Sequence, residues 1–159
     1  MRSVKLGFLM ILPPLLAHLV VNVGVPVARD VWLVSPFSWG LLFLGYWFWV
    51  GSLFGRGENP LASFLWGSSL TVLCAAIYVQ QFFWTDPANM SRALSLLAQL
   101  YVFFAGPVSS TFFVSILGMS SVRNTALNLW AYVFMLGVFA LGFLWQRRRQ
   151  APRPRRRKK

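Results

Sequence analysis

Five polar side chains lie within apolar stretches of this 159-residue chain, and their types suit the binding of a small polar solute. Imidazole, amide and phenol groups donate and accept hydrogen bonds without needing a charge. If the apolar stretches pack together as helices, these side chains are expected to form one hydrogen-bonded cluster. Such a cluster would serve either as hydrogen bonds between helices or as a small polar binding site. The candidate polar cluster consists of His18, Asn22, Tyr78, Gln81 and Gln99.

Catalytic and metal-binding residues are scarce in the sequence. The single His18, the single Cys74 and three scattered acids cannot supply the three or four ligands of a metal site. One cysteine also excludes an intramolecular disulfide and a thiol-pair redox motif. No charged residue lies deep in an apolar stretch, where proton relays and ion-coupled transporters usually carry one. We therefore expect no enzyme activity, no metal and no cofactor.

The stretches that carry the polar residues are long enough to cross a bilayer. Hydrophobic residues make up 57% of the chain and charged residues 11%, whereas a soluble domain carries about 25% charged residues. A bilayer core needs roughly 17–25 helical residues, and only helices or closed barrels satisfy the backbone in lipid. None of the stretches alternates with period two, as a barrel strand does. The predicted helices are Leu6–Val25, Phe37–Phe54, Leu61–Trp84, Ala93–Leu117 and Thr125–Trp145.

The predicted fold class is therefore all-α, a polytopic membrane helix bundle that forms one domain over residues 1–145, with five transmembrane helices. The first stretch leaves an alternative open, because paired prolines kink a helix. With Pro13 and Pro14 inside it, Leu6–Val25 could be re-entrant or interfacial, which leaves four crossings. Removal of this stretch as a signal peptide after Ala28 is disfavoured, since Pro26 stands where a small residue is wanted.

A strongly basic segment follows the last stretch. Nine of the fifteen Lys and Arg residues lie after Trp145, without an acid among them. Basic residues beside a membrane span favour the cytoplasmic side, and each contributes about 1 kcal/mol near an anionic leaflet. We expect residues 146–159 to be a disordered cytoplasmic tail of a cell-membrane protein. The residues expected to contact anionic lipid headgroups are Arg147, Arg148, Arg149, Arg153, Arg155, Arg156, Arg157, Lys158 and Lys159.

The tail also bears on partners and on orientation. It lacks aromatic residues that would stack on bases, so no specific nucleic acid is expected. With five crossings and a cytoplasmic tail, eleven Lys and Arg residues lie inside and four lie outside. The four outside are Arg2, Lys5, Arg56 and Arg123.

Small and polar residues share one face in several predicted helices when residues are placed 100° apart. Small residues let membrane helices approach closely, and polar ones bond between them. These faces predict packing within the chain; the glycine face of Phe37–Phe54 could instead meet a partner. The faces are Gly40, Gly51 and Gly55 in the second helix; Ser63, Gly67, Thr71, Cys74, Tyr78 and Gln81 in the third; and Ser95, Gln99, Gly106 and Ser110 in the fourth.

These observations favour a non-enzymatic integral membrane protein that acts as an accessory or assembly subunit of a larger membrane complex. Its expected partner is another membrane protein or a second copy of the chain. The alternative is a small-solute transporter, or its membrane-embedded substrate-binding subunit, that uses the candidate polar cluster. Helix breaks at Pro13-Pro14 and at Gly106-Pro107 fit a binding site within the membrane.

Overall fold

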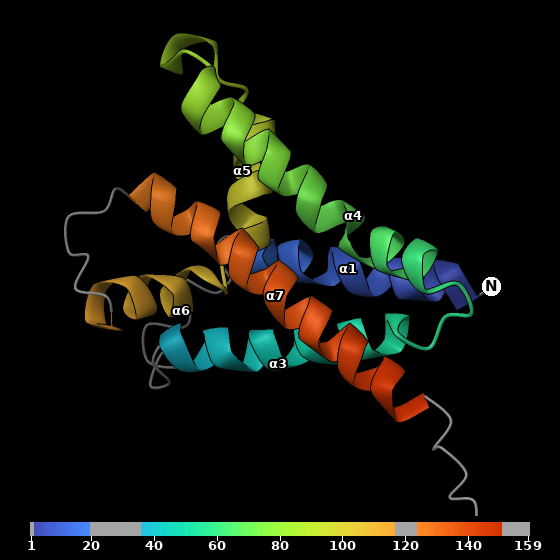
Figure 1. Ribbon diagram of the computed structural model, residues 1–159. Helices are drawn as coiled ribbons and strands as arrows, with labels where there is room; N and C mark the ends of the chain where they lie inside the picture. The colour runs from blue at the N-terminus through green and yellow to red at the C-terminus, as the bar shows by residue number, and fades with distance from the viewer. Residues whose placement is uncertain (1, 20–35, 117–123, 151–159) are drawn as a thin grey trace, which may run out of the picture.

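The computed structural model describes residues 2–19, 36–116 and 124–150 (Figure 1). These ranges are mainly helical and contain no strand. Besides α-helices, they contain one 3-10 turn, η3 (Pro87–Asn89), and two π-helical segments, η2 (Gln80–Trp84) and η4 (Phe112–Ile116). The α-helices are α1 (Arg2–Leu19), α3 (Pro36–Phe54), α4 (Pro60–Val79), α5 (Arg92–Val102), α6 (Gly106–Thr111) and α7 (Asn124–Gln150).

Among the described residues, three helical segments are long and apolar enough to cross a membrane: Phe37–Phe54, Pro60–Trp84 and Thr125–Gln150. The pair formed by α5 and Gly106–Ser115 is bent by 68° and makes a fourth if it is counted as one span. An all-helical fold with three to four helices able to span a membrane is thus confirmed for the described residues, but the count of five is not. The first predicted span appears as a shorter apolar helix, Leu6–Leu19, and residues 20–25 lie outside the described ranges, as does the Ala28 cleavage position.

Prolines mark where several helices begin and where one is interrupted. A proline in the first helical turn costs no hydrogen bond, because the N–H groups there have no partner within the helix. Accordingly, α4 begins at Pro60, and the Asn59 side chain accepts a hydrogen bond from the Ala62 N–H at 3.2 Å. Pro107 lies in the first turn of α6, so the predicted fourth helix divides into α5 and α6. In contrast, α1 continues through Pro13 and Pro14.

Asp86 and Pro87 precede the predicted fourth helix, Ala93–Leu117, but do not start an α-helix. These residues begin η3 instead, and the Asp86 side chain makes no capping hydrogen bond. The α-helix starts only at Arg92. The reason is that Met90, with φ −66° and ψ 130°, is extended and separates the two elements.

Helices α3 and α7 form the most extensive helix pair, and they run in the same direction. Gly51 lies against the backbone of Phe139, and one turn later Gly55 lies against the backbone of Phe143. Because both residue numbers increase together, the two helices are parallel. Figure 1 shows them crossing, with their N-terminal ends on one side of the bundle and their C-terminal ends on the other.

Helix α4 runs antiparallel to α7. The Phe64 ring, near the start of α4, lies 5.3 Å from the ring of Phe143, near the end of α7. At the other end of α4, the Tyr78 hydroxyl donates to the Thr125 carbonyl at 3.1 Å. The loop between α3 and α4 therefore lies at the same end of the bundle as the C-terminus of α7 (Figure 1).

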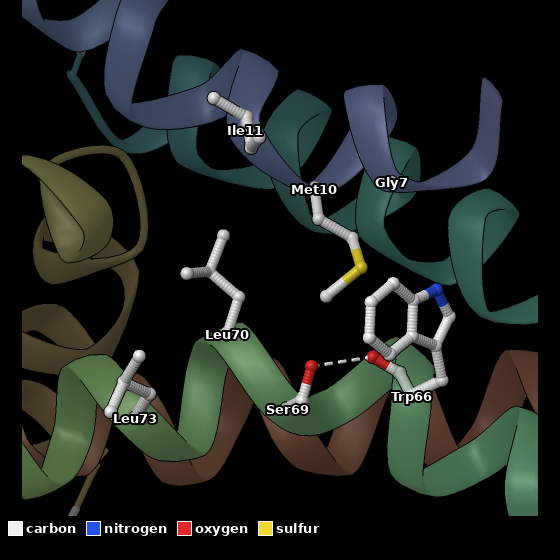
Figure 2. A pocket seen from close by; sticks show the side chains of 7 residues that line it. All are labelled: Gly7, Met10, Ile11, Trp66, Ser69, Leu70 and Leu73. Atoms are coloured by element: carbon white, nitrogen blue, oxygen red, sulfur yellow. Dashed lines mark hydrogen bonds between the residues drawn. The ribbon is translucent and has the colours of Figure 1, made fainter. Parts of the chain in front are cut away.

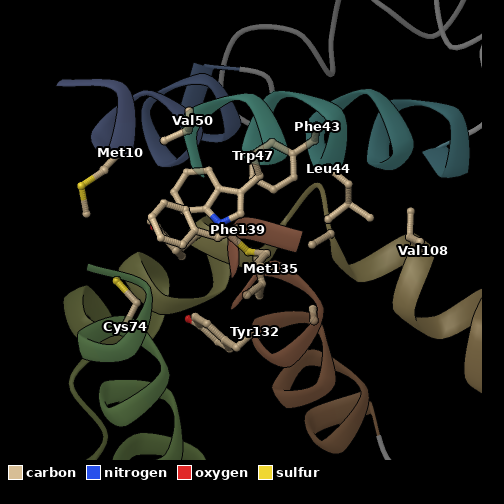
Figure 3. Close-up of a cluster of buried hydrophobic side chains, with 14 of the residues drawn as sticks. Met10, Phe43, Leu44, Trp47, Val50, Cys74, Val108, Tyr132, Met135 and Phe139 are labelled. Carbon is tan, nitrogen blue, oxygen red and sulfur yellow. The ribbon is translucent and has the colours of Figure 1, made fainter. Parts of the chain in front are cut away.

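The core is formed where α3, α4, α5 and α7 meet. Trp47 is fully buried there, and its ring lies 6.2 Å from that of Phe139 and 6.0 Å from that of Phe43 (Figure 3). Helix α1 joins this core through Met10, and the Tyr46 hydroxyl donates to the Leu9 carbonyl at 2.6 Å. Large aromatic side chains thus fill much of the space between these helices.

Candidate functional site

Three buried tyrosines from three helices lie together in the described interior. Tyr78 lies on α4, Tyr101 on α5 and Tyr132 on α7, and each is at most 1% exposed. The rings of Tyr101 and Tyr132 stack 6.2 Å apart, and those of Tyr78 and Tyr132 lie 5.9 Å apart. We call these three residues the tyrosine cluster.

Each hydroxyl of the tyrosine cluster has a partner on a different helix. Tyr101 shares a 2.9 Å hydrogen bond with the Thr71 hydroxyl on α4. Tyr132 donates to the Ala98 carbonyl on α5 at 2.8 Å, and Tyr78 donates to the Thr125 carbonyl on α7. Such bonds between membrane helices contribute about 0.6–1.7 kcal/mol each. The cluster therefore ties α4, α5 and α7 together.

Two buried polar atoms in the described ranges have no hydrogen-bond partner: Trp47 Nε1 and Ser95 Oγ. The Trp47 ring stands edge-on to that of Tyr101, with centroids 6.0 Å apart and planes at 90°. An aromatic ring face is a weak acceptor for an N–H group. The unpaired indole thus borders the tyrosine cluster.

The polar cluster predicted from the sequence is dispersed. Gln81 is buried, but its Oε1 accepts from the Ser91 N–H at 2.8 Å, and Tyr78 bonds to Thr125. Gln99 and His18 are exposed. Asn22 lies outside the described residues. The two buried members therefore connect helix ends rather than line a common site.

The predicted polar face of the fourth helix is not the one that α5 buries. Gln99 is exposed, whereas Ala98, Tyr101 and Val102 are buried. Sequence analysis missed Tyr101 and Trp47 as central residues. The signal was present for Tyr101, because Ala98, Tyr101, Val102 and Ala105 follow helical spacing and all four are buried.

The three glycines of the predicted packing or partner face are buried inside the chain. A Cβ on Gly40 would lie 2.7 Å from the Phe104 carbonyl oxygen, and Gly51 and Gly55 contact the backbone of α7. Only glycine allows the helices to come this close. In this chain the glycine face of α3 serves the packing of α3 on α6 and α7.

The helix α7 extends into the basic segment. It reaches Gln150, so Arg147, Arg148 and Arg149 lie in its last turn. Cations are favourable at a helix C-terminus, and the first following proline comes only at 152. The Arg149 guanidinium lies 4.6 Å from the centre of the Trp145 ring. The remaining tail residues, 151–159, lie outside the described ranges.

Taken together, the described interior offers hydroxyl groups bonded within the chain. Among the residues described, no three His, Cys, Asp or Glu side chains come close enough to hold a metal ion. The arrangement can orient helices, and it leaves one indole N–H and one serine hydroxyl without a partner. In comparisons with known proteins, no family model, no curated protein and no solved structure matches the chain.

Proposed function

We propose that the chain is a non-enzymatic membrane protein that acts as an accessory or assembly subunit of a larger membrane complex. The observation that carries this proposal is that the tyrosine cluster forms hydrogen bonds between the chain's own helices. Its three hydroxyls are all bonded to neighbouring helices, so they hold the bundle together and are not free to act on a substrate. Because the buried hydroxyls of the cluster bond within the chain, we expect partners to bind at the outer surface of the bundle.

The outer face of α3 around Gly45 is the surface we assign to a partner helix. Gly45 is exposed, and a Cβ built there would meet nothing within 4 Å. Leu41 and Trp49 lie one turn on either side, 50% and 49% exposed. A glycine between two large side chains forms a notch into which another membrane helix can pack closely. Gly51 and Gly55 are unsuitable, because α7 already covers them.

The test is affinity purification of the tagged full chain from its native membrane in mild detergent. Gly45→Ile should fold, since the space is open, and should lose the co-purifying membrane subunit. Gly137→Ile is the matched control, because Gly137 is also exposed with open space around it, on α7. Equal recovery of the subunit with both variants would remove Gly45 as the partner surface. A chain that purifies alone from wild-type membranes would contradict the accessory function itself.

The proposal includes an arrangement in the membrane with four crossings and both termini in the cytoplasm. The directions of α3, α4 and α7 support it, because Gly55, at the end of α3, lies beside Gln146, at the end of α7. Both helices then leave the membrane on one side. Helix α4 returns to the opposite side. Helix α1 runs opposite to α3 in Figure 1, and the proposal takes the predicted stretch Leu6–Val25, of which the structure describes Leu6–Leu19, as the fourth crossing.

In this arrangement α5 and α6 form a re-entrant segment that enters and leaves on the side opposite the tail. Helix α5 begins beside the end of α4, where Ser91 bonds Gln81, and reaches Thr71 through Tyr101. Helix α6 then packs against the first half of α7, where the Ser109 hydroxyl donates to the Leu127 carbonyl. Figure 1 shows α6 directed toward the end of the bundle where α7 begins.

The distribution of basic residues agrees with the four-crossing arrangement. The cytoplasmic side receives Arg2, Lys5, Arg56 and the nine tail residues, twelve in all, against three on the other side. Five crossings divide the same residues eleven to four. The excess of Lys and Arg on the cytoplasmic side is therefore larger with four crossings, as the positive-inside rule favours.

The second candidate function is a small-solute transporter or its substrate-binding subunit. The 68° break between α5 and α6 favours it, since broken helices form binding sites in many transporters. The unpaired Trp47 Nε1 borders the same region. Under this alternative, Tyr101→Phe and Trp47→Phe should each change the uptake of a solute in whole cells. Unaltered uptake with both would remove it.

A further inference from the structure

An apolar groove of about 240 Å³ lies between α1 and α4 (Figure 2). Trp66, Leu70 and Leu73 face it from α4, and the side chain of Met10 reaches toward Trp66 from α1. The full lining is Gly7, Met10, Ile11, Trp66, Ser69, Leu70 and Leu73.

The groove has the character of a site for a hydrocarbon chain. Two of its lining side chains, Ser69 and Trp66, carry a polar group, and the Ser69 hydroxyl already donates to the Trp66 carbonyl of its own helix at 2.7 Å (Figure 2). The volume is smaller than the roughly 300–1,000 Å³ of typical small-molecule pockets. Ile11, Trp66 and Leu73 are 47–56% exposed, which opens the groove sideways to the bilayer.

Basic residues lie beyond one end of the groove. Figure 2 shows Gly7 and Trp66 toward that end and Ile11 and Leu73 toward the other, so α1 and α4 run in the same direction along the groove. Arg2 lies five helical positions before Gly7, or about 7 Å along the axis. Lys5 is closer, and the exposed Arg56 lies in the loop before α4.

Glu58, in the same loop as Arg56, offsets one of these charges. Three cations and one acid leave a net positive end. A phospholipid has the same polarity, with an apolar chain that continues into a charged headgroup. The positive end therefore favours an anionic phospholipid as the occupant over an apolar partner helix, because only the phospholipid carries a negative charge next to its apolar chain.

We propose that the groove between α1 and α4 binds an acyl chain of an anionic phospholipid from the cytoplasmic leaflet, with its phosphate at the end where α1 and α4 begin and where the sequence places Arg2, Lys5 and Arg56. The proposal rests on the four-crossing arrangement, which brings these three residues to the cytoplasmic side. The bound lipid fills the space that the two helices leave between them. It thereby completes the packing of α1 on the bundle.

The experiment uses the full chain in vesicles of equal parts phosphatidylglycerol and phosphatidylcholine, with a trace of phosphatidylglycerol that carries a photoreactive group in its acyl chain. After illumination, mass spectrometry maps the lipid adducts. They should concentrate on peptides that contain Met10 and Leu70. The same photoreactive chain on phosphatidylcholine should give fewer adducts there. Removal of one cation in Arg56→Gln should lower the phosphatidylglycerol preference about fivefold.

Gly7→Phe should fill the groove and abolish these adducts, since a Cβ on Gly7 meets nothing within 4 Å. Gly137→Phe, equally open but on α7, should leave them unchanged. If Gly7→Phe does not fold, Ile11→Trp blocks the same groove from an exposed position.

Adducts spread evenly over all helices, or unaffected by a filled groove, would overturn the proposal. Adducts in the groove without a headgroup preference would overturn the anionic lipid, and cross-links between two copies through the groove would replace the lipid with a second chain. Capture of a membrane subunit through Gly45 is measured separately, and Gly7→Phe should leave it intact. A failure of the lipid site is thus distinguishable from a failure of the accessory function.

Discussion

Gly55 of α3 and Gln146 of α7 lie side by side. A Cβ placed on Gly55 would sit 2.9 Å from the Cβ of Gln146 and 2.7 Å from the Phe143 carbonyl oxygen. This one approach joins the C-terminal ends of two parallel helices. It also brings the loop that contains Arg56 to the same end of the bundle as Arg147–Arg149. The proposed arrangement in the membrane follows from that juxtaposition.

Leucine at Gly51 or Gly142 should strongly destabilise the bundle. A Cβ on Gly51 would overlap the Phe139 carbonyl oxygen, and one on Gly142 would overlap that of Phe48. Backbone atoms cannot move aside as a side-chain tip can, so each variant should lower the free energy of unfolding by at least about 1–3 kcal/mol. Thermal unfolding in detergent measures it, with Gly137→Leu as the control in open space. Equal Tm values for the three variants would mean that α3 and α7 do not pack in this way.

Phenylalanine at Tyr132 should destabilise the bundle by about 0.6–1.7 kcal/mol, the usual range for hydrogen bonds between membrane helices. The change keeps the stacked ring but removes the bond to the Ala98 carbonyl. Denaturation in mixed micelles gives the free energy of unfolding. Ser52→Ala is the control, because Ser52 bonds only its own helix, at the Trp49 carbonyl. A loss no greater than that of the control would show that the tyrosine bond is not formed.

Leucine at Gln81 should loosen the start of α5. Gln81 Oε1 is the acceptor for the Ser91 N–H, ahead of the first helical residue, Arg92. Without it, that N–H should exchange with deuterium faster, as should the first turn of α5. Gln81→Glu retains an acceptor oxygen and should keep most of the protection. Exchange at Ser91 that is unchanged in Gln81→Leu would contradict the role of this bond.

Helical spacing predicted the inward face of α4 well. Gly67, Thr71, Cys74 and Tyr78 were grouped from 100° rotations, and all four are buried. The Asn59-Pro60 start was also readable, since capping depends on neighbours in the sequence. The buried face of α4 and its N-terminal cap depend on residues within a few positions of one another, so the sequence alone is enough to predict them.

Relationships between distant helices could not be read from the sequence. Nothing in the spacing of Gly51 and Gly55 indicates that α7 runs parallel to α3. Tyr101 rather than Gln99 meets Tyr132, because the packing of α5 against α7 decides which of its faces is buried. Charge counts alone separated the possible orientations poorly, because the eleven-to-four and twelve-to-three divisions differ by a net one residue, although five Lys and Arg residues change sides.

Labelling of single cysteines with a membrane-impermeant maleimide on intact cells tests the proposed arrangement most directly. With Cys74 replaced by Ala, cysteine is introduced at Glu58, between α3 and α4, or at Asn89, between α4 and α5; both positions are exposed. The four-crossing arrangement predicts labelling at Asn89→Cys and protection at Glu58→Cys until the cells are opened. Five crossings with a cytoplasmic tail predict the reverse, and labelling of Glu58→Cys alone would contradict the account.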